Sequence, residues 1–393
     1  MRARAWDTGR WVEVEIDGSR IGRTRPADGP GSPDPADLWI GPAFWDLQTN
    51  GRWGISYSSP TITPDQVIEV VRALRHLGTA RLCPTLITAS AEHTLRGVRA
   101  IAEACRADPI VDAMVAGIHL EGPSISEIDG YRGAHPLSAI RDPDWAEFTE
   151  LQQAADGRIR IVTLAPERSG SIEYIARANA AGVIVALGHT SADAATLWAA
   201  IAAGARLSTH LGNGIATPIS RHPNPIWHQA AADALMASFI ADGHHLDDST
   251  LKVLIRAKTH RRSILVSDHS PLAGLPAGVY GDWEVHPSGK ILVAGTPYLA
   301  GSNQDLDQGI NTLMRAAGCG LAEALTTATL NPANLLGAGE TPMAPGSRAN
   351  LIAFRLDQGG PFPTFRLVST CVDGHWIEAD PAIRQTPEVV SAG

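Results

Sequence analysis

The chain of 393 residues has few cysteines, few aromatic residues and no long apolar run. Its four cysteines lack C-x-x-C spacing, which argues against a structural zinc cluster and favours a reducing compartment, expected to be the cytoplasm. No apolar run reaches the roughly 18 residues of a membrane helix, and no long apolar segment follows the charged N-terminus. The net charge of −9 argues against nucleic acid as a partner. These absences leave an ordinary globular protein without a membrane span or secretory signal.

The middle of the chain alternates short aliphatic runs with stretches of helical composition. In residues 64–78, apolar residues recur at helical spacing and Gly78 suits the C-terminal cap. Eight strand-like runs over roughly 300 residues predict an α/β fold, a (β/α)₈ barrel. A doubly wound sheet is the competing interpretation, but it would not need eight strands in this rhythm. The runs lie at about 40–47, 79–83, 115–120, 160–164, 183–188, 206–210, 236–240 and 263–267.

Both ends of the chain are rich in short strands instead. Residues 11–25 alternate apolar and polar side chains around an Asp-Gly turn, as a hairpin does. Residues 348–380 contain three further strand-like runs separated by glycine and proline. We expect the two ends to pair into one small β-domain of residues 1–40 and 342–393, beside a barrel of residues 41–341.

Four chemically active side chains follow predicted barrel strands, where the active site of such a barrel forms. Glu121 follows the third strand, His189 the fifth, His210 the sixth and Asp268 the eighth. Taken singly, each is more often a hydrogen-bonded loop residue or a helix cap than a functional group. Together on one rim, two imidazoles and one carboxylate suit a catalytic metal ion, and a second carboxylate suits a proton shuttle.

The chain lacks a His-x-His pair after the first strand, where many metal-dependent barrel hydrolases hold a metal. Residues 44–51, "FWDLQTNG", place Gln48 and Asn50 in these positions instead. Side-chain amides bind transition metals poorly. The sequence therefore raises the question whether a metal has been lost or is held elsewhere on the rim.

A series of motifs gives the chain a family resemblance that answers this question. In chain order they are "FWDLQTNG", "GTARLCPTLIT", "GIHLEGP", "VTLAPE", "GHTSAD", "THLGNGI", "ADGHHLD", "LVSDHS" and "LAGS". They resemble the motifs of the N-acetylglucosamine-6-phosphate deacetylases, in the amidohydrolase superfamily. The resemblance spans about residues 40 to 340, and the terminal strands fit the small β-sandwich that this family adds.

The resemblance implies one divalent metal ion per subunit, because some members of the family carry Gln-x-Asn and keep a single metal. Its ligands would be Glu121, His189 and His210. Zinc is the favoured ion, with iron, cobalt and manganese as alternatives. Gln48 and Asn50 are expected to orient water or ligands without binding the metal themselves.

The resemblance also implies hydrolysis of an acetamide on an amino sugar. Asp268 would take a proton from the attacking water and hand it to the leaving amine. His135 matches the family histidine that donates a hydrogen bond to the acetyl oxygen as charge develops there. The alternative interpretation of His135 is a loop residue fixed by Pro136.

Substrate-binding residues are implied in the same way. Arg221 and His245 match the phosphate contacts of the family, and a guanidinium suits a phosphate because it binds two oxygens at once. The family arginine reaches across from a neighbouring subunit, so a homodimer is expected. The other implied substrate contacts are Ala134, Asn213, Gly214, Asp242, Leu299, Ala300 and Gly301.

Departures from the family pattern leave the substrate open. "SRHPNPIWHQ" (220–229) and "DHSPLAG" (268–274) replace family segments, and the roles of His222, His244 and His269 are not assigned. One alternative is an amidohydrolase for another N-acyl compound, such as an unphosphorylated acetamido sugar or an N-acyl amino acid. Another is a catalytically silent paralogue that binds a sugar phosphate, although a binding protein would not need a metal set and a base together.

Overall fold

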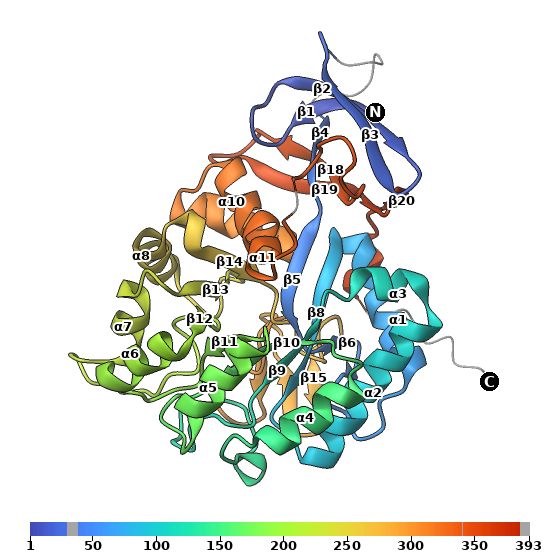
Figure 1. Cartoon of the computed structure of the whole chain (residues 1–393). Coiled ribbons are helices and arrows are strands. Elements are labelled where there is room, and N and C mark those ends of the chain that lie inside the picture. The colour runs from blue at the N-terminus through green and yellow to red at the C-terminus, as the bar shows by residue number, and fades with distance from the viewer. Residues whose placement is uncertain (30–37, 340, 386–393) are drawn as a thin grey trace.

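The structure, a computed structural model, describes residues 1–29, 38–339 and 341–385. A parallel eight-stranded barrel, surrounded by helices, carries a mixed seven-stranded sheet at one end (Figure 1). Strands from both ends of the chain, blue and red in Figure 1, share that second sheet. No helix in the described ranges combines the length and the apolarity that a membrane crossing requires.

The predicted barrel is confirmed, with every strand hydrogen-bonded in parallel to its neighbour in chain order. The predicted first run of residues 40–47 covers parts of two strands, because the chain passes from β4 (Leu38–Pro42) of the terminal sheet into the barrel through Ala43 alone. The barrel strands are β5 (Phe44–Thr49), β8 (Thr79–Ile87), β9 (Ile118–Glu121), β10 (Ile159–Leu164), β11 (Ile184–Leu187), β12 (Ala205–Ser208), β13 (Met236–Ile240) and β14 (Ser263–Val266).

The barrel closes where the first strand meets the segment after the last. The backbone N–H of Asp268 donates to the Gln48 carbonyl at 2.9 Å, and that of Asn50 donates to the His269 carbonyl at 2.9 Å. These bonds bring the Gln-x-Asn pair beside Asp268, although about 220 residues separate them in the sequence.

Helices surround the barrel, and the first shows why its sequence folds as it does. Thr63 and Gln66 form a capping box, Pro64 occupies the first turn, and Gly78 ends the following 3₁₀ turn η1 (Leu74–Leu77) at φ +93°. The helices are α1 (Pro64–Ala73), α2 (Ala91–Ala107), α3 (Pro109–Met114), α4 (Trp145–Ala154), α5 (Ser171–Ala180), α6 (Ala194–Ala203), α7 (Pro225–Ala231), α8 (Asp248–Lys258), α9 (Leu306–Thr312), α10 (Leu321–Ala328) and α11 (Leu330–Leu335). Shorter turns are η2 (Leu137–Ala139), η3 (His260–Arg262), the π-turn η4 (Leu313–Ala317) and η5 (Pro381–Arg384).

The terminal strands pair across the two ends of the chain, as expected. The sheet order is β20-β19-β18-β4-β1-β2-β3, with β1 (Arg2–Ala5), β2 (Trp11–Asp17), β3 (Arg20–Pro26), β18 (Leu351–Asp357), β19 (Thr364–Val372) and β20 (His375–Glu378). The sheet also folds back on itself, because Ile21 of β3 exchanges backbone hydrogen bonds with residues 346–347 ahead of β18. It thereby encloses a core of its own that includes Val14, Ile40 and Leu351. Residues 30–37 and 386–393 of the expected terminal domain, and residue 340, lie outside the described residues.

Two apolar cores and two small sheets position the site. Strand residues inside the barrel pack with Ala333 and Leu335 of α11 and with Leu336, which caps that helix. A larger core fills the space between the strands and the surrounding helices. Two small sheets, β6 (Gly51–Arg52) with β7 (Ile55–Ser56) and β15 (Gly278–Tyr280) with β16 (Trp283–Val285) and β17 (Ile291–Val293), follow β5 and β14. Both follow carboxyl ends of strands, which is the rim where the predicted site residues stand.

Candidate active site

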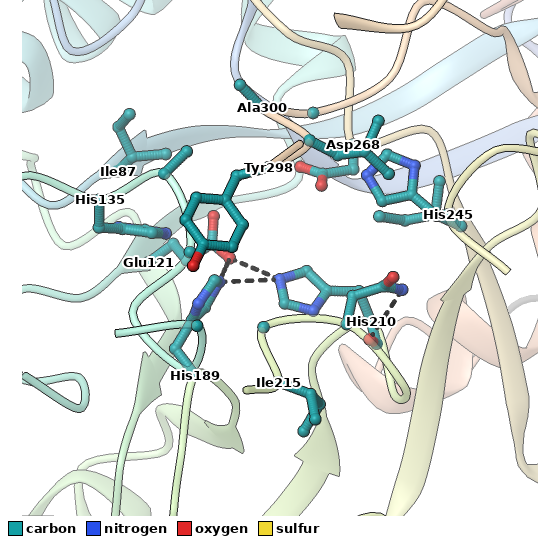
Figure 2. Close-up of a pocket in the computed structure, with 18 of the residues that line it drawn as sticks. Ile87, Glu121, His135, His189, His210, Ile215, His245, Asp268, Tyr298 and Ala300 are labelled. Atoms are coloured by element: carbon teal, nitrogen blue, oxygen red, sulfur yellow. Dashed lines mark hydrogen bonds and ion pairs between the residues drawn. The ribbon is translucent and has the colours of Figure 1, made fainter. Parts of the chain in front are cut away.

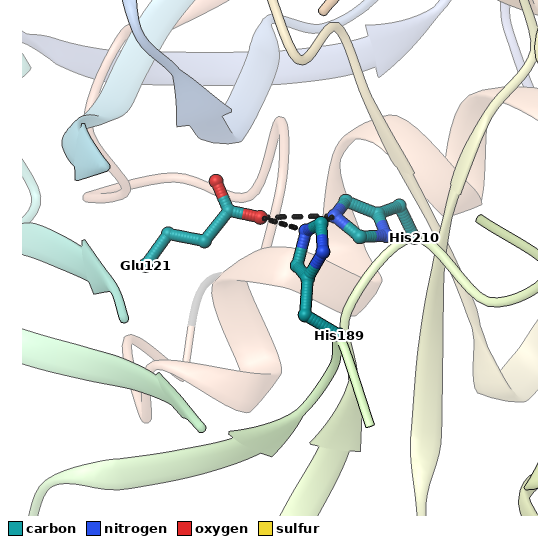
Figure 3. A group of neighbouring side chains, drawn as sticks. All are labelled: Glu121, His189 and His210. Atoms are coloured by element: carbon teal, nitrogen blue, oxygen red, sulfur yellow. Dashed lines mark hydrogen bonds and ion pairs between the residues drawn. The ribbon is translucent and has the colours of Figure 1, made fainter. Parts of the chain in front are cut away.

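Glu121, His189 and His210 converge at the carboxyl ends of β9, β11 and β12 (Figure 3). Nε2 of His210 lies 2.9 Å and Nε2 of His189 lies 3.3 Å from Oε1 of Glu121. The two Nε2 atoms are 3.2 Å apart. All three side chains are buried, and the structure thus brings together the three residues predicted as metal ligands.

The protonation pattern of this cluster suits a cation. Nδ1 of His189 lies 2.9 Å from the Tyr131 carbonyl, which requires a proton on Nδ1 and leaves a lone pair on Nε2. That lone pair faces a carboxylate oxygen and a second imidazole nitrogen, a donor set that a divalent ion satisfies. Burial alone would raise the pKa of Glu121, but the imidazoles of His189 and His210 beside the carboxylate outweigh burial and hold this pKa well below its usual value. The charged carboxylate that a metal requires is therefore favoured.

The backbone at these strand ends is held in an unusual conformation. Eight non-glycine residues in the described part of the chain have positive φ, and three of them are His189 at +49°, His210 at +31° and Asp268 at +47°. Such residues are uncommon and gather where the surrounding structure forces a side chain into a functional direction. Gly214, at φ +60°, packs directly on the His189 ring, and a methyl group there would lie 2.7 Å from His189 Nδ1. The geometry of this cluster is thus fixed by the backbone and by close packing.

Asp268 faces this cluster from the opposite side of the rim (Figure 2). Its Oδ1 accepts hydrogen bonds from Nε2 of Gln48 at 3.0 Å and Nδ2 of Asn50 at 2.8 Å. Gln48 and Asn50 were expected to orient water or ligands, and in the structure their side-chain amides orient the carboxylate of Asp268. Burial, together with the charge of Glu121, raises the pKa of Asp268 to about 6. A carboxyl with this pKa can accept and return a proton near neutral pH.

His135 is buried on the third side of the cluster. Its Nδ1 lies 2.8 Å from the Thr88 hydroxyl oxygen, and its ring stands edge-on to His189 with centroids 4.4 Å apart. Burial and the neighbouring His189 lower the pKa of His135 to about 3, so the ring is neutral. The single proton of the Thr88 hydroxyl can go to the Glu121 carbonyl at 3.4 Å or to Nδ1 of His135. In the second case Nε2 of His135 carries the only ring proton and becomes a hydrogen-bond donor.

One cavity of about 490 Å³ contains these groups, a volume within the usual range for small-molecule sites (Figure 2). Apolar side chains cover much of its wall. Among the predicted residues, those that line it are Asn50, Glu121, Ala134, His135, His189, His210, Asn213, Gly214, His245, Asp268, Leu299, Ala300 and Gly301. No arginine or lysine is among the described residues of its wall.

Three predicted residues stand outside the cavity wall. Gln48 lies buried behind Asp268, and Asp242 lies behind His245, where its Oδ2 accepts a 2.8 Å hydrogen bond from Nδ1 of that ring. Arg221 is exposed in the loop between β12 and α7 and is not among the residues that line the cavity of its own chain.

The histidines without an assigned role fall elsewhere. His222 is exposed beside Arg221, and His244 is not part of the cavity wall. His269 is buried with Nε2 3.0 Å from Oδ1 of Asp305, which also pairs with the buried Arg52. His269 therefore belongs to an ion-pair network beneath the rim.

Sequence reasoning missed several residues of the cavity wall, including Ile87, Ile215, Trp283 and Tyr298. Ile87 and Ile215 are ordinary apolar residues at a strand end and in a loop. Trp283 and Tyr298 reach the cavity only because the β15–β17 insertion folds over the rim. Because Trp283 and Tyr298 do not lie at the end of a barrel strand, the strand pattern of the sequence could not predict them.

The amidohydrolase family model matches residues 40–381 of the chain. A curated N-acetylglucosamine-6-phosphate deacetylase of Bos taurus is 35% identical over 76% of this chain and 74% of its own length. An N-acetylgalactosamine-6-phosphate deacetylase of Shewanella sp. (strain ANA-3) is 34% identical over 75% of this chain and 73% of its own length. A mutant N-acetyl-D-glucosamine-6-phosphate deacetylase of Mycobacterium smegmatis, solved in complex with N-acetyl-D-glucosamine-6-phosphate, has TM-score 0.84 and 31% identity, covering 95% of this chain and 98% of that one.

Proposed function

Because this chain belongs to the amidohydrolase family, we propose that it hydrolyses the acetamide of N-acetylglucosamine 6-phosphate, giving glucosamine 6-phosphate and acetate. The observation that carries the proposal is the convergence of Glu121, His189, His210 and Asp268 in one cavity. A sugar-phosphate-binding protein without activity would need neither this ligand set nor a base beside it.

Glu121, His189 and His210 would hold one divalent ion, and zinc suits this set of two imidazoles and one carboxylate. When bound, the ion supplies a Lewis acid that polarises the amide carbonyl and makes its water more acidic. Gln48 and Asn50 hold Oδ1 of Asp268, so Oδ2 is the oxygen that accepts the proton of the water. The amine is a poor leaving group when unprotonated, and Asp268 returns the proton to its nitrogen. His135 donates from Nε2 to the acetyl oxygen as negative charge develops there.

Of the parts of the proposed substrate, the phosphate group has the least support from the residues of a single chain. His245 reaches the cavity, but its wall has no arginine or lysine among the described residues. The exposed Arg221 would therefore serve the cavity of a second copy of the chain, in a homodimer, where its guanidinium could bind two phosphate oxygens.

N-acetylgalactosamine 6-phosphate is the second candidate substrate. Relatives with that activity in their names are 34% and 30% identical to this chain, close to the 35% of the glucosamine relative. The two sugars differ only in the configuration at carbon 4, and the metal, the base and the acetamide chemistry would be the same.

The test is acetate release by metal-quantified enzyme from four compounds: both sugar 6-phosphates, and N-acetylglucosamine and N-acetylgalactosamine without phosphate. We expect fast release from at least one phosphorylated sugar and loss of release in Asp268→Asn. Equal release with and without phosphate would overturn the phosphate assignment. No release from any of them by enzyme with one metal per chain would direct the search to other N-acyl compounds.

A further inference from the structure

One hydrogen bond joins two loops across the mouth of the cavity. Tyr298 stands in the loop between β17 and Gly301, and Figure 2 shows its ring in front of the Glu121, His189 and His210 cluster. Its hydroxyl donates to Oδ2 of Asp129 at 2.8 Å, in the loop after β9. The contact thereby links two rim segments that are 169 residues apart in the sequence.

The segment reached by Tyr298, residues 128–135, is held together internally by Arg132. Oδ1 of Asp129 accepts from Nη2 of Arg132 at 2.9 Å, and Nη1 of Arg132 donates to the His135 carbonyl at 3.1 Å. The backbone N–H of Arg132 also donates to the Ile128 carbonyl at 2.9 Å. Arg132 therefore connects the Asp129 carboxylate to the His135 backbone.

The same segment is in tight contact on its other side. Gly130, at φ +82°, packs on the loop after β12, and a methyl group there would lie 2.5 Å from Cα of Ala216. Tyr298 and Ala216 thus hold residues 128–135 between two walls of the cavity.

Segment 128–135 supplies two groups to the site. The Tyr131 carbonyl fixes the proton on Nδ1 of His189, and His135 itself stands beside the metal cluster. We propose that Tyr298 and Asp129 are positioning residues, whose hydrogen bond keeps the Tyr131 carbonyl and His135 in place around the metal cluster. For catalysis, the inference rests on the proposed deacetylation.

The hydrogen bond between Tyr298 and Asp129 is weak enough to break when the mouth of the cavity opens. The side chain of Asp129 is 66% exposed, so water competes for it and the bond contributes little on its own. Substrate entry and product release can therefore break it. Tyr298 remains a donor throughout, because its hydrogen bond to Asp129 raises the pKa of the phenol.

The experiment compares Tyr298→Phe and Asp129→Ala, singly and combined, in the metal-loaded full chain. Tyr298→Phe keeps the ring and removes only the hydroxyl. The matched control is Tyr280→Phe in β15 of the same insertion, whose exposed hydroxyl donates to the Pro276 carbonyl at 3.0 Å. Hydrogen exchange of the amides in residues 128–135, followed by mass spectrometry, reports opening of the segment. Transfer of the metal to a chelator reports the hold on His189, and neither readout requires activity.

Loss of one such hydrogen bond should speed exchange in residues 128–135 about 2- to 10-fold. Metal transfer should accelerate several-fold, and kcat should fall with little change in KM. The combined variant should add little to Asp129→Ala, which already lacks both the Tyr298 and the Arg132 contact. Tyr280→Phe should leave all of these unchanged. Unchanged exchange and metal transfer in Tyr298→Phe would overturn the proposal. Faster exchange with unaltered metal transfer and kcat would limit the bond to holding the loop and overturn the positioning role. If the unaltered chain releases no acetate, the proposed function fails, while exchange and metal transfer still decide the hold on His189.

Discussion

The two sides of the cavity are built in different ways. The side proposed to hold the metal, called the metal side, consists of Glu121, His189 and His210, which are buried and stand at the ends of barrel strands. The other side, proposed to bind the rest of the substrate and called the substrate side, consists of residues 215–224 ahead of α7, where Arg221 is exposed, and of Trp283 and Tyr298, which line the cavity. The metal side is therefore set by the barrel itself, while the substrate side depends on long loops that can vary without disturbing the barrel.

We therefore expect the metal side to determine the chemical step and the substrate side to determine which substrates are preferred. Changes on the metal side should reduce turnover of every substrate, because they act on atoms common to all acetamides. Apart from the hydrogen bond of Tyr298 to Asp129, which is proposed to support the metal side, changes on the substrate side should alter the ranking of substrates and leave the shared chemistry intact. Four predictions test this separation, from the largest expected effect to the smallest.

Asp268→Asn should have the largest effect. The amide keeps an oxygen that can accept from Gln48 and Asn50, so the local structure is retained, but it cannot take a proton from water. We expect kcat to fall by about 10² to 10⁴, with the metal content unchanged. Acetate release and metal analysis measure this, and a variant within tenfold of the unaltered enzyme would remove Asp268 from the mechanism.

Gly214→Ala should disturb the metal side through its backbone. The added methyl group would lie 2.7 Å from Nδ1 of His189 and compete with the hydrogen bond to Tyr131. We expect metal affinity to fall about 10- to 100-fold, as for the loss of other groups that orient a ligand. Gly182→Ala is the control, because Gly182 has φ +75° but nothing within 4 Å of the added carbon. Equal metal affinity in the two variants would contradict the packing argument.

The same division explains how much the sequence could predict. Eight aliphatic runs and the residues after them locate the barrel and Glu121, His189, His210 and Asp268, because strand ends meet on one rim whatever the loops do. The contact of Gln48 and Asn50 with Asp268 was not predicted, since it depends on how the first strand closes against the last.

Loop residues follow no such rule. Tyr298 faces the cavity only through the fold of an insertion, and a pattern of strands and helices contains no signal for it. Arg221 was predicted from resemblance alone, and its place in a substrate site stays a prediction.

Arg221→Ala should act on the substrate side alone. The variant lacks the guanidinium proposed to bind two phosphate oxygens, so KM for the phosphorylated sugar should rise about 10-fold or more. Turnover of an unphosphorylated acetamido sugar, however slow, should not change. Arg256→Ala is the control, because Arg256 is exposed on α8. An equal loss for both kinds of sugar would place Arg221 in the shared chemistry and break the separation.

Asn50→Ala should have the smallest effect, a shift in pH dependence. Asp268 must be ionised to accept a proton, so kcat/KM should fall tenfold per pH unit as pH decreases through its pKa. Burial and Glu121 raise that pKa to about 6, while the hydrogen bond from Asn50 lowers it. A bound cation also favours the carboxylate, so the acidic limb of the unaltered enzyme should lie at or below about pH 6. Removing Asn50 should move this limb to higher pH by less than about one unit, with kcat at high pH nearly retained. A shift to lower pH, or a uniform loss at every pH, would show that Asn50 acts on the metal or the substrate instead of on Asp268.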